Sequence, residues 1–120
     1  MELHKIDFEK KGLNSLIGKL ESDIMDALWD KEKATCREVF DEAGEKNDVA
    51  YTTITVTMDR MHSKGLIERK IHKGKGGLIY TYSPKYSRKE LSEEVSDKFV
   101  SFLKDTFGSS SVAYLRKKLK

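Results

Sequence analysis

The chain has 120 residues and a net charge of +3, and charged residues make up 36% of it. This length suits one globular domain with a small appendage. So polar a composition makes a single buried core barely sufficient, which is compatible with oligomerisation. No apolar run approaches the roughly 20 residues that a bilayer span needs, and no signal segment opens the chain, so we expect a cytoplasmic protein without a membrane partner. The single cysteine, Cys36, excludes an intramolecular disulfide framework.

Charge is segregated along the chain. Residues 18–50 carry five Lys/Arg against ten Asp/Glu, whereas residues 51–89 carry nine against two. A basic surface confined to one part of a protein is typical of polyanion binding. The second segment is therefore where we expect a nucleic acid to bind.

Residues 1–17 show no sustained apolar period. We interpret them as an N-terminal arm that packs on its own body or on a partner, and a partly ordered terminus explains them equally well. From Gly18 onward the apolar residues follow a helical period, and they are Leu20, Ile24, Ala27 and Leu28. We expect this first helix to end at Trp29, with the indole ring in the core.

A capping box predicts the second helix, with Thr35 as the N-cap and Glu38 three residues later. We expect Gly44 to end this helix and a loop to follow over residues 45–49. Arg37 lies in the first turn of the helix, where its cation can clamp a nucleic-acid backbone.

Residues 51–61 contain four threonines, which favour a strand because β-branched side chains lose rotamer freedom in a helix. Two observations favour a helix instead: the apolar residues keep a 3.6-residue period through Met61, and Gly65 supplies a stop. As the third helix in succession, it completes a helix-turn-helix plan. The short side chains on its outer face suit a DNA major groove. Thr57 is the least favoured of the threonines for the groove, since its neighbour Met58 belongs to the core.

After this helix the period of the apolar residues changes to two. Residues 66–71 and 78–82 have the pattern of strands, and residues 72–77 between them are rich in glycine and lysine. A β-hairpin directly after a recognition helix is a wing. Its cationic tip is suited to phosphates or to a minor groove.

Ser87 and Glu90 form another capping box, which starts a long helix. We expect residues 108–111 to break it and a short helix to follow over residues 112–119. Little of the chain remains to cover the apolar stripe of the long helix, so a second copy is the favoured partner over folding back in a monomer. The stripe consists of Leu91, Val95, Phe99, Phe102, Leu103 and Phe107.

These elements predict a mainly α (α+β) fold, a winged helix-turn-helix with a C-terminal helical dimerisation segment. We expect an arm at 1–17, a DNA-binding domain at 18–84 and a dimerisation region at 85–120. The expected partners are double-stranded DNA and a second copy of the chain. The residues expected to contact bases or phosphates are Arg37, Tyr51, Thr52, Thr53, Thr55, Val56, Arg60, Lys64, Lys70, Lys73 and Lys75.

Enzymatic activity has little support in the sequence. The histidines do not stand at ligand spacing with Cys36 or with one another, and no Ser/His/Asp set occurs, so we expect no metal and no cofactor. Cys36 itself has two interpretations, a redox sensor with a lowered pKa or, more favoured, a buried structural cysteine. Because winged helices also mediate protein contacts, a protein-interaction module is the alternative to a DNA-binding regulator.

Several spaced segments together resemble the penicillinase-repressor family of the BlaI/MecI type, which includes copper-transport repressors. The resemblance covers roughly residues 17–111. It implies a dimeric winged-helix repressor of a palindromic operator, with the third helix in the major groove and the C-terminal helices forming the dimer. The segments are 17–21 (IGKLE), 24–29 (IMDALW), 34–39 (ATCREV), 50–54 (AYTTI), 59–61 (DRM), 64–66 (KGL) and 82–84 (YSP).

The chain also departs from the family pattern. Val56-Thr57 stand where the family usually has threonine and then leucine, which implies a different base preference. The wing is longer than usual and lacks the Gly-Arg-Ala-Tyr pattern. Antibiotic-responsive members are cut at an Asn-Phe bond and copper-responsive members carry a C-terminal cysteine cluster. The sequence has neither feature and so assigns no effector.

Overall fold

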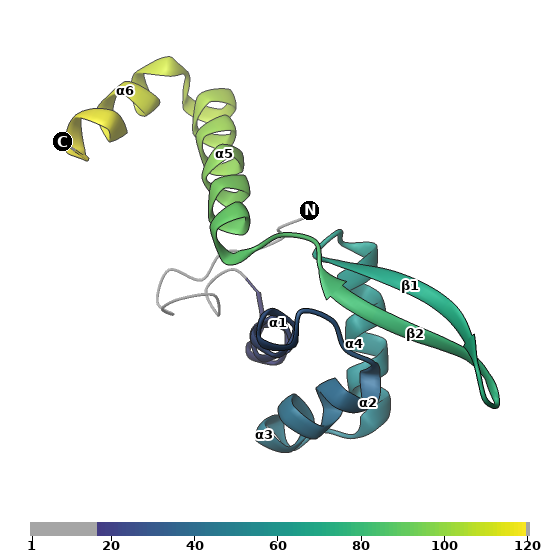
Figure 1. Ribbon diagram of the computed structural model, residues 1–120. Coiled ribbons are helices and arrows are strands. Elements are labelled where there is room, and N and C mark those ends of the chain that lie inside the picture. Colours follow the sequence, from purple (N-terminus) through teal and green to yellow (C-terminus); the bar gives the residue numbers. More distant parts are fainter. Residues whose placement is uncertain (1–16, 120) are drawn as a thin grey trace. The chain divides into compact units, whose positions relative to one another are not determined.

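The computed structural model describes residues 17–119 (Figure 1). The predicted arm therefore falls almost entirely outside the described residues. The chain divides into two compact units, Met1–Lys85 and Tyr86–Lys120. Each unit is described by itself.

Helices in succession form the body of the first unit (Figure 1). Helix α1 (Lys19–Lys31) packs against helices that follow it, and α2 (Cys36–Val39) contacts α4 (Tyr51–Ser63). This arrangement is the predicted helix-turn-helix. The helical elements are α1 (Lys19–Lys31), α2 (Cys36–Val39), the π-helical turn η2 (Phe40–Gly44), α3 (Glu45–Asn47) and α4 (Tyr51–Ser63).

The core of this unit is apolar and lies between the helices and the base of the hairpin. Its buried members include Ile24, Ala27 and Leu28 of α1, as predicted, whereas Leu20 of the predicted stripe is only half-buried. Trp29 does not belong to it: the side chain is only half-buried, and α1 continues to Lys31. The physical reason is helical geometry, since each residue turns about 100° from the one before and Trp29 falls at the edge of the buried face.

The prediction that Gly44 ends the second helix is wrong. Its φ of -66° and ψ of -45° are helical, and the helical segment continues to Asn47. A Cβ at this position would collide with the ring of Phe40, so the glycine serves close packing rather than a left-handed turn. Asp48 adopts the left-handed conformation instead, with φ 52° and ψ 50°, and ends the segment.

The two strands form an antiparallel hairpin, β1 (Ile67–Gly74) and β2 (Gly77–Pro84). Gly74 pairs with Gly77, which leaves a two-residue turn, Lys75-Gly76, in place of the longer tip that the glycines predicted. The left-handed φ of 88° at Gly76 explains why a glycine stands there. At the base of the hairpin Ala34 pairs with Tyr82 through two backbone hydrogen bonds of 2.9 and 2.8 Å, which fix the wing to the helical body.

The second unit consists of α5 (Arg88–Phe107) and α6 (Ser109–Lys118), which pack against each other. The predicted capping box is present: the Ser87 hydroxyl accepts a hydrogen bond from the Glu90 amide, and the Glu90 carboxylate accepts one from the Ser87 amide. Gly108 alone interrupts the helices, with φ 88°. The serines after it were predicted to lengthen this break, but they form the first turn of α6.

The fold is thus mainly helical with one hairpin, a winged helix-turn-helix followed by C-terminal helices, as the sequence predicted. Among residues 17–119, no helix combines the length and the apolar character that crossing a membrane requires.

Candidate nucleic-acid interface

Helix α4 has one buried side and one exposed side. Ile54, Met58 and Met61 are fully buried, which explains why a threonine-rich stretch is helical: packing of this stripe outweighs the intrinsic preference for a strand. The opposite side faces solvent and carries mainly short side chains. Its exposed residues are Thr52, Thr53, Val56, Asp59, Arg60 and Ser63.

The threonines of α4 differ in what their hydroxyls do. Thr57 is buried, and its hydroxyl donates to the carbonyl of Thr53 at 2.6 Å. Thr55 is half-buried, and its hydroxyl donates to the carbonyl of Thr52 at 2.9 Å. Thr57 therefore points inward, as the neighbouring Met58 suggested, whereas Thr52 and Thr53 stay on the exposed side.

An aromatic cluster lies where α4 begins. The guanidinium carbon of Arg37 is 4.3 Å from the centre of the Tyr51 ring and 5.6 Å from that of Phe40. The two rings meet edge to face, with centroids 5.6 Å apart. This stacking holds an exposed cation of α2 beside the first turn of α4.

A second polar cluster joins α4 to the hairpin. Arg69 of β1 donates to the carboxylate of Asp59 at 3.0 Å, and its guanidinium carbon is 5.2 Å from the centre of the Tyr80 ring. The hydroxyl of Tyr82 also hydrogen-bonds Arg69. Sequence reasoning missed Asp59 and Arg69 as a pair, although the helical period already places Asp59 one turn beyond Val56.

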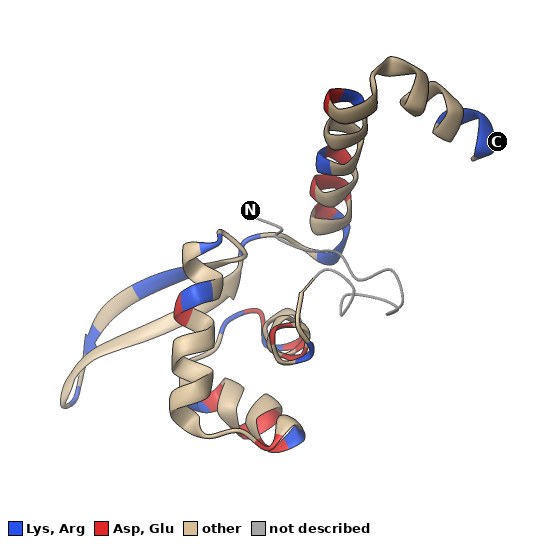
Figure 2. Cartoon of the chain, turned by 180° about the vertical axis from the view of Figure 1, so that it is seen from behind, with Lys and Arg blue, Asp and Glu red and all other residues tan. Residues whose placement is uncertain are grey.

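The lysines of the hairpin are exposed. Side chains alternate along a strand, so Lys70 and Lys73 lie on opposite faces of the ribbon, while Lys75 occupies the turn. Figure 2 shows Lys and Arg along the hairpin and several Asp and Glu on α1 to α3. The acidic segment of the sequence therefore forms α1 to α3, and most of the basic segment forms α4 and the hairpin.

Lys64 has a different setting from the other predicted DNA contacts. Its ammonium lies 3.8 Å from the carboxylate of Glu21, and only 23% of its side chain is exposed. The neighbouring carboxylate already offsets much of this positive charge. Arg60, one turn earlier, is exposed.

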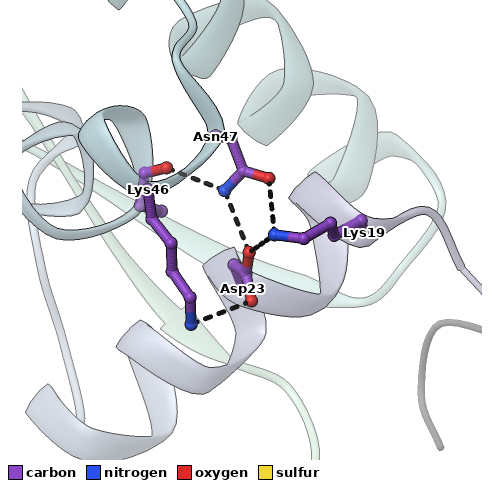
Figure 3. A network of polar contacts seen from close by, with 5 residues as sticks. Lys19, Asp23, Lys46 and Asn47 are labelled. Atoms are coloured by element: carbon purple, nitrogen blue, oxygen red, sulfur yellow. Dashed lines mark hydrogen bonds and ion pairs between the residues drawn. The ribbon is translucent and has the colours of Figure 1, made fainter.

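A polar network holds the end of α3, just before α4 starts (Figure 3). The carboxylate of Asp23 accepts hydrogen bonds from Lys19 at 3.0 Å and Asn47 at 2.9 Å, and Lys46 lies 3.4 Å away. Burial raises the pKa of Asp23, but these donors together outweigh it and hold the pKa below its usual value. The ionised carboxylate thereby ties α1 to the segment that leads into α4.

Cys36 gives no sign of activation. Burial raises the pKa of its thiol, and a hydrogen bond with Tyr82 opposes this shift only in part. A raised pKa disfavours the thiolate that redox chemistry needs. Within residues 17–119 no three His, Cys, Asp or Glu side chains gather as a metal site would require.

The apolar stripe of α5 is only partly covered. Leu91 is buried, and Val95, Phe99 and Leu103 are half-buried, but the exposed fraction of Phe102 is 57% and that of Phe107 is 66%. Tyr114 and Leu119 of the second unit are exposed as well. Large apolar side chains gathered in one small unit are typical of an interface.

The helix-turn-helix, the exposed face of α4 and the basic hairpin define a winged helix-turn-helix protein. The chain belongs to the penicillinase repressor family, whose model matches residues 17–119. This is a family of regulators rather than of enzymes, and it is the family that the spaced segments of the sequence resemble.

Two curated relatives carry the name transcriptional regulator BlaI, each from a strain of Mycobacterium tuberculosis. The chain is similar to both, with 33% identity over 76 residues, or 62% of this chain and 52% of the relative. It thus spans about half the length of the curated relatives it matches. Among solved structures, Stf76 from the Sulfolobus islandicus plasmid-virus pSSVx is 24% identical, with a TM-score of 0.46 over 63% of this chain and 94% of that one.

Proposed function

We propose that this protein is a homodimeric transcriptional repressor that binds a palindromic operator in double-stranded DNA. In this proposal residues 51–64 enter the major groove and the hairpin over residues 66–82 acts as the wing. Membership of the penicillinase repressor family supports it, as do the relatives named transcriptional regulators.

The observation that carries the proposal is the exposed face of α4. Threonine and valine side chains there are short, so the helix axis can come close to the base edges. Val56 is 57% exposed on a helix whose opposite side is fully buried. An exposed methyl group of this kind matches the thymine methyl, and threonine hydroxyls can donate to or accept from base edges.

Cations around this face would contact phosphates. Arg37 is held at one end of α4 by the Tyr51 ring, and Arg60 is exposed on the helix itself. Lys70, Lys73 and Lys75 extend the positive charge along the hairpin. Such contacts fix the register of a protein on the duplex without reading its sequence. We assign Lys64 a smaller contribution to phosphate binding, because the carboxylate of Glu21 lies beside its ammonium group.

The second unit supplies the dimer in this proposal. The exposed rings of Phe102 and Phe107 would be covered by the same surface of a second copy. A two-fold axis between two identical recognition helices requires two half-sites of opposite orientation, which is a palindrome.

Salt dependence of duplex affinity tests the DNA-binding role. We expect the affinity of the full chain for its best duplex to fall linearly with salt on a log–log plot, with a slope of about 0.9 per phosphate contacted. The double variant Lys73→Ala/Lys75→Ala should bind every duplex more weakly. A dimer of this variant loses four lysines, so at about 0.9 per phosphate contact the slope should fall by about 3.6.

A matched control removes the same charge outside the basic segment. Lys31 and Lys33 are exposed near the end of α1. The double variant Lys31→Ala/Lys33→Ala should change the slope far less than the hairpin variant does. Salt-insensitive binding, or no binding to any duplex, would contradict the proposal and favour the protein-interaction alternative.

A further inference from the structure

Asp59 places a carboxylate on the surface that we assign to DNA binding, where repulsion by phosphates makes an acidic side chain unexpected. Residues 51–89 contain only two acidic residues, Asp59 and Glu68. At about 100° per residue, Asp59 falls on the same outward stripe of α4 as Thr52, Val56 and Ser63. These four residues are all exposed, so the carboxylate stands in the middle of the face that we assign to the major groove.

The carboxylate is held in place from the hairpin. Asp59 Oδ1 accepts a hydrogen bond from Arg69 Nη1 at 3.0 Å, although the side chain of Asp59 remains 66% exposed. Arg69 is itself fixed, with 24% of its side chain exposed, the Tyr80 ring 5.2 Å away and the Tyr82 hydroxyl bonded to it. A carboxylate oriented in this way loses little rotamer freedom when it meets a ligand.

Charge compensation by Arg69 makes the position compatible with DNA. An unpaired carboxylate near phosphates would be repelled, whereas the ion pair is close to neutral. The second oxygen, Oδ2, is left as a hydrogen-bond acceptor on the exposed face. Among major-groove edges, guanine presents only acceptors, and thymine presents an acceptor and a methyl group. The amino groups of cytosine and adenine are the donors that such an oxygen can meet.

Cytosine fits this acceptor better than adenine. The adenine amino group stands beside the N7 acceptor, which repels a carboxylate, whereas the cytosine edge offers its N4 amino group alone. We propose that Asp59 is a base-reading residue that selects cytosine at one position of each half-site, with Arg69 as the residue that positions its carboxylate. This inference rests on the proposed DNA-binding function and names one specificity determinant within it.

The test measures base preference rather than affinity alone. A site is first selected from a random pool of duplexes with the native full chain. Affinities are then measured for the selected duplex and for its single-base variants at every half-site position. The native protein should prefer cytosine at one position by about tenfold. Asp59→Asn should lose that preference and tolerate adenine, and Asp59→Ser should lose it as well, while preferences at the other positions stay the same.

Two further variants separate base reading from a purely structural role of the ion pair. Arg69→Gln keeps the Asp59 carboxylate but removes the ion pair that orients it. This variant should weaken the same preference for cytosine. Glu68→Gln removes an equal charge from the other acidic residue and should change no base preference.

Three outcomes would overturn the inference. The first is a selected site with no cytosine position that responds to Asp59. The second is an equal loss of affinity for all duplexes in Asp59→Asn and Arg69→Gln, with the base preferences unchanged. This result would mean that the ion pair only stabilises the contact between α4 and the hairpin. In both cases the proposed function would stand. The third is failure of the native chain to select any duplex, which would remove the proposed function as well.

Discussion

Arg37 and Tyr51 show how one contact changes the role assigned to a residue. The sequence predicted only that Tyr51 contacts bases or phosphates. The centre of the ring lies 4.3 Å from the Arg37 guanidinium carbon. The ring itself therefore holds a cation beside the start of α4. Contacts of this kind contribute about 0.5–1 kcal/mol at exposed sites.

This geometry predicts different effects for two substitutions of the same tyrosine. Tyr51→Phe keeps the ring and should leave duplex affinity within about twofold of the native value. Tyr51→Leu removes the ring and should lower affinity for all sequences, in the same direction as Arg37→Ala. Fluorescence anisotropy with the native chain as reference measures both. Equal losses from Tyr51→Phe and Tyr51→Leu would instead assign the contact to the hydroxyl.

Asp23 makes stability depend on pH at the acidic end. Its pKa is lowered in the folded protein, so between the folded and unfolded pKa values the unfolded chain binds more protons. The stabilising contribution is therefore complete above the ordinary value of 3.8 and is lost as pH falls through the lowered pKa of the folded protein.

We expect Asp23→Asn to lower the free energy of unfolding at pH 7 by about 1 kcal/mol, because the charged acceptor of several hydrogen bonds is lost. The difference from the native protein should narrow below about pH 4, where the native carboxyl becomes protonated. Urea denaturation at a series of pH values measures it. Asp41→Asn, at an exposed acid, is the control. A difference in unfolding free energy between Asp23→Asn and the native protein that does not change with pH would contradict this role of the carboxylate.

Among the elements, the helical segment from α2 to α3 depends on a glycine for close packing. Gly44→Ala would place a methyl group against the Phe40 ring, and we expect a loss of about 1–2 kcal/mol in unfolding free energy. Gly18→Ala is the matched control, since nothing lies within 4 Å of a Cβ there. Thermal or urea denaturation compares the two. A stabilised Gly44→Ala protein would show that helix propensity outweighs the contact.

Elements whose signals are local could be predicted from the sequence. The capping boxes at Thr35 and Ser87 require only residues three apart, and both are present. The buried stripe of α4 follows from its period, and the hairpin follows from alternation and glycine. Each of these features depends on neighbours in the chain rather than on the rest of the fold.

Features that depend on the orientation of particular side chains or on the register of strands could not be predicted. The role of Gly44 requires knowing that the Phe40 ring turns back over it, and only then does Asp48 become the end of the segment. The pairing of Asp59 with Arg69 joins a helix to a strand across a turn of the chain. The turn of the hairpin was predicted too long, because glycine marks a turn without giving the register of the strands.

For the whole molecule, the exposed aromatic rings of the second unit predict self-association. Phe102→Asp should convert dimers to monomers, because a buried unpaired carboxylate at an apolar interface is strongly unfavourable. Ser101→Asp, at the exposed neighbouring residue, adds the same charge and should leave the dimer intact. Sedimentation velocity at micromolar concentration measures both. An unchanged dimer mass for Phe102→Asp would place the interface elsewhere.

The central claim is that two copies of this chain read a symmetric DNA site through α4. Selection of bound duplexes from a random pool tests it most directly. The account predicts one enriched motif with two inverted half-sites whose centres lie about 10 base pairs apart, or a multiple of that distance, on one face of the duplex. Enrichment of a single asymmetric site, or of no sequence at all, would contradict it.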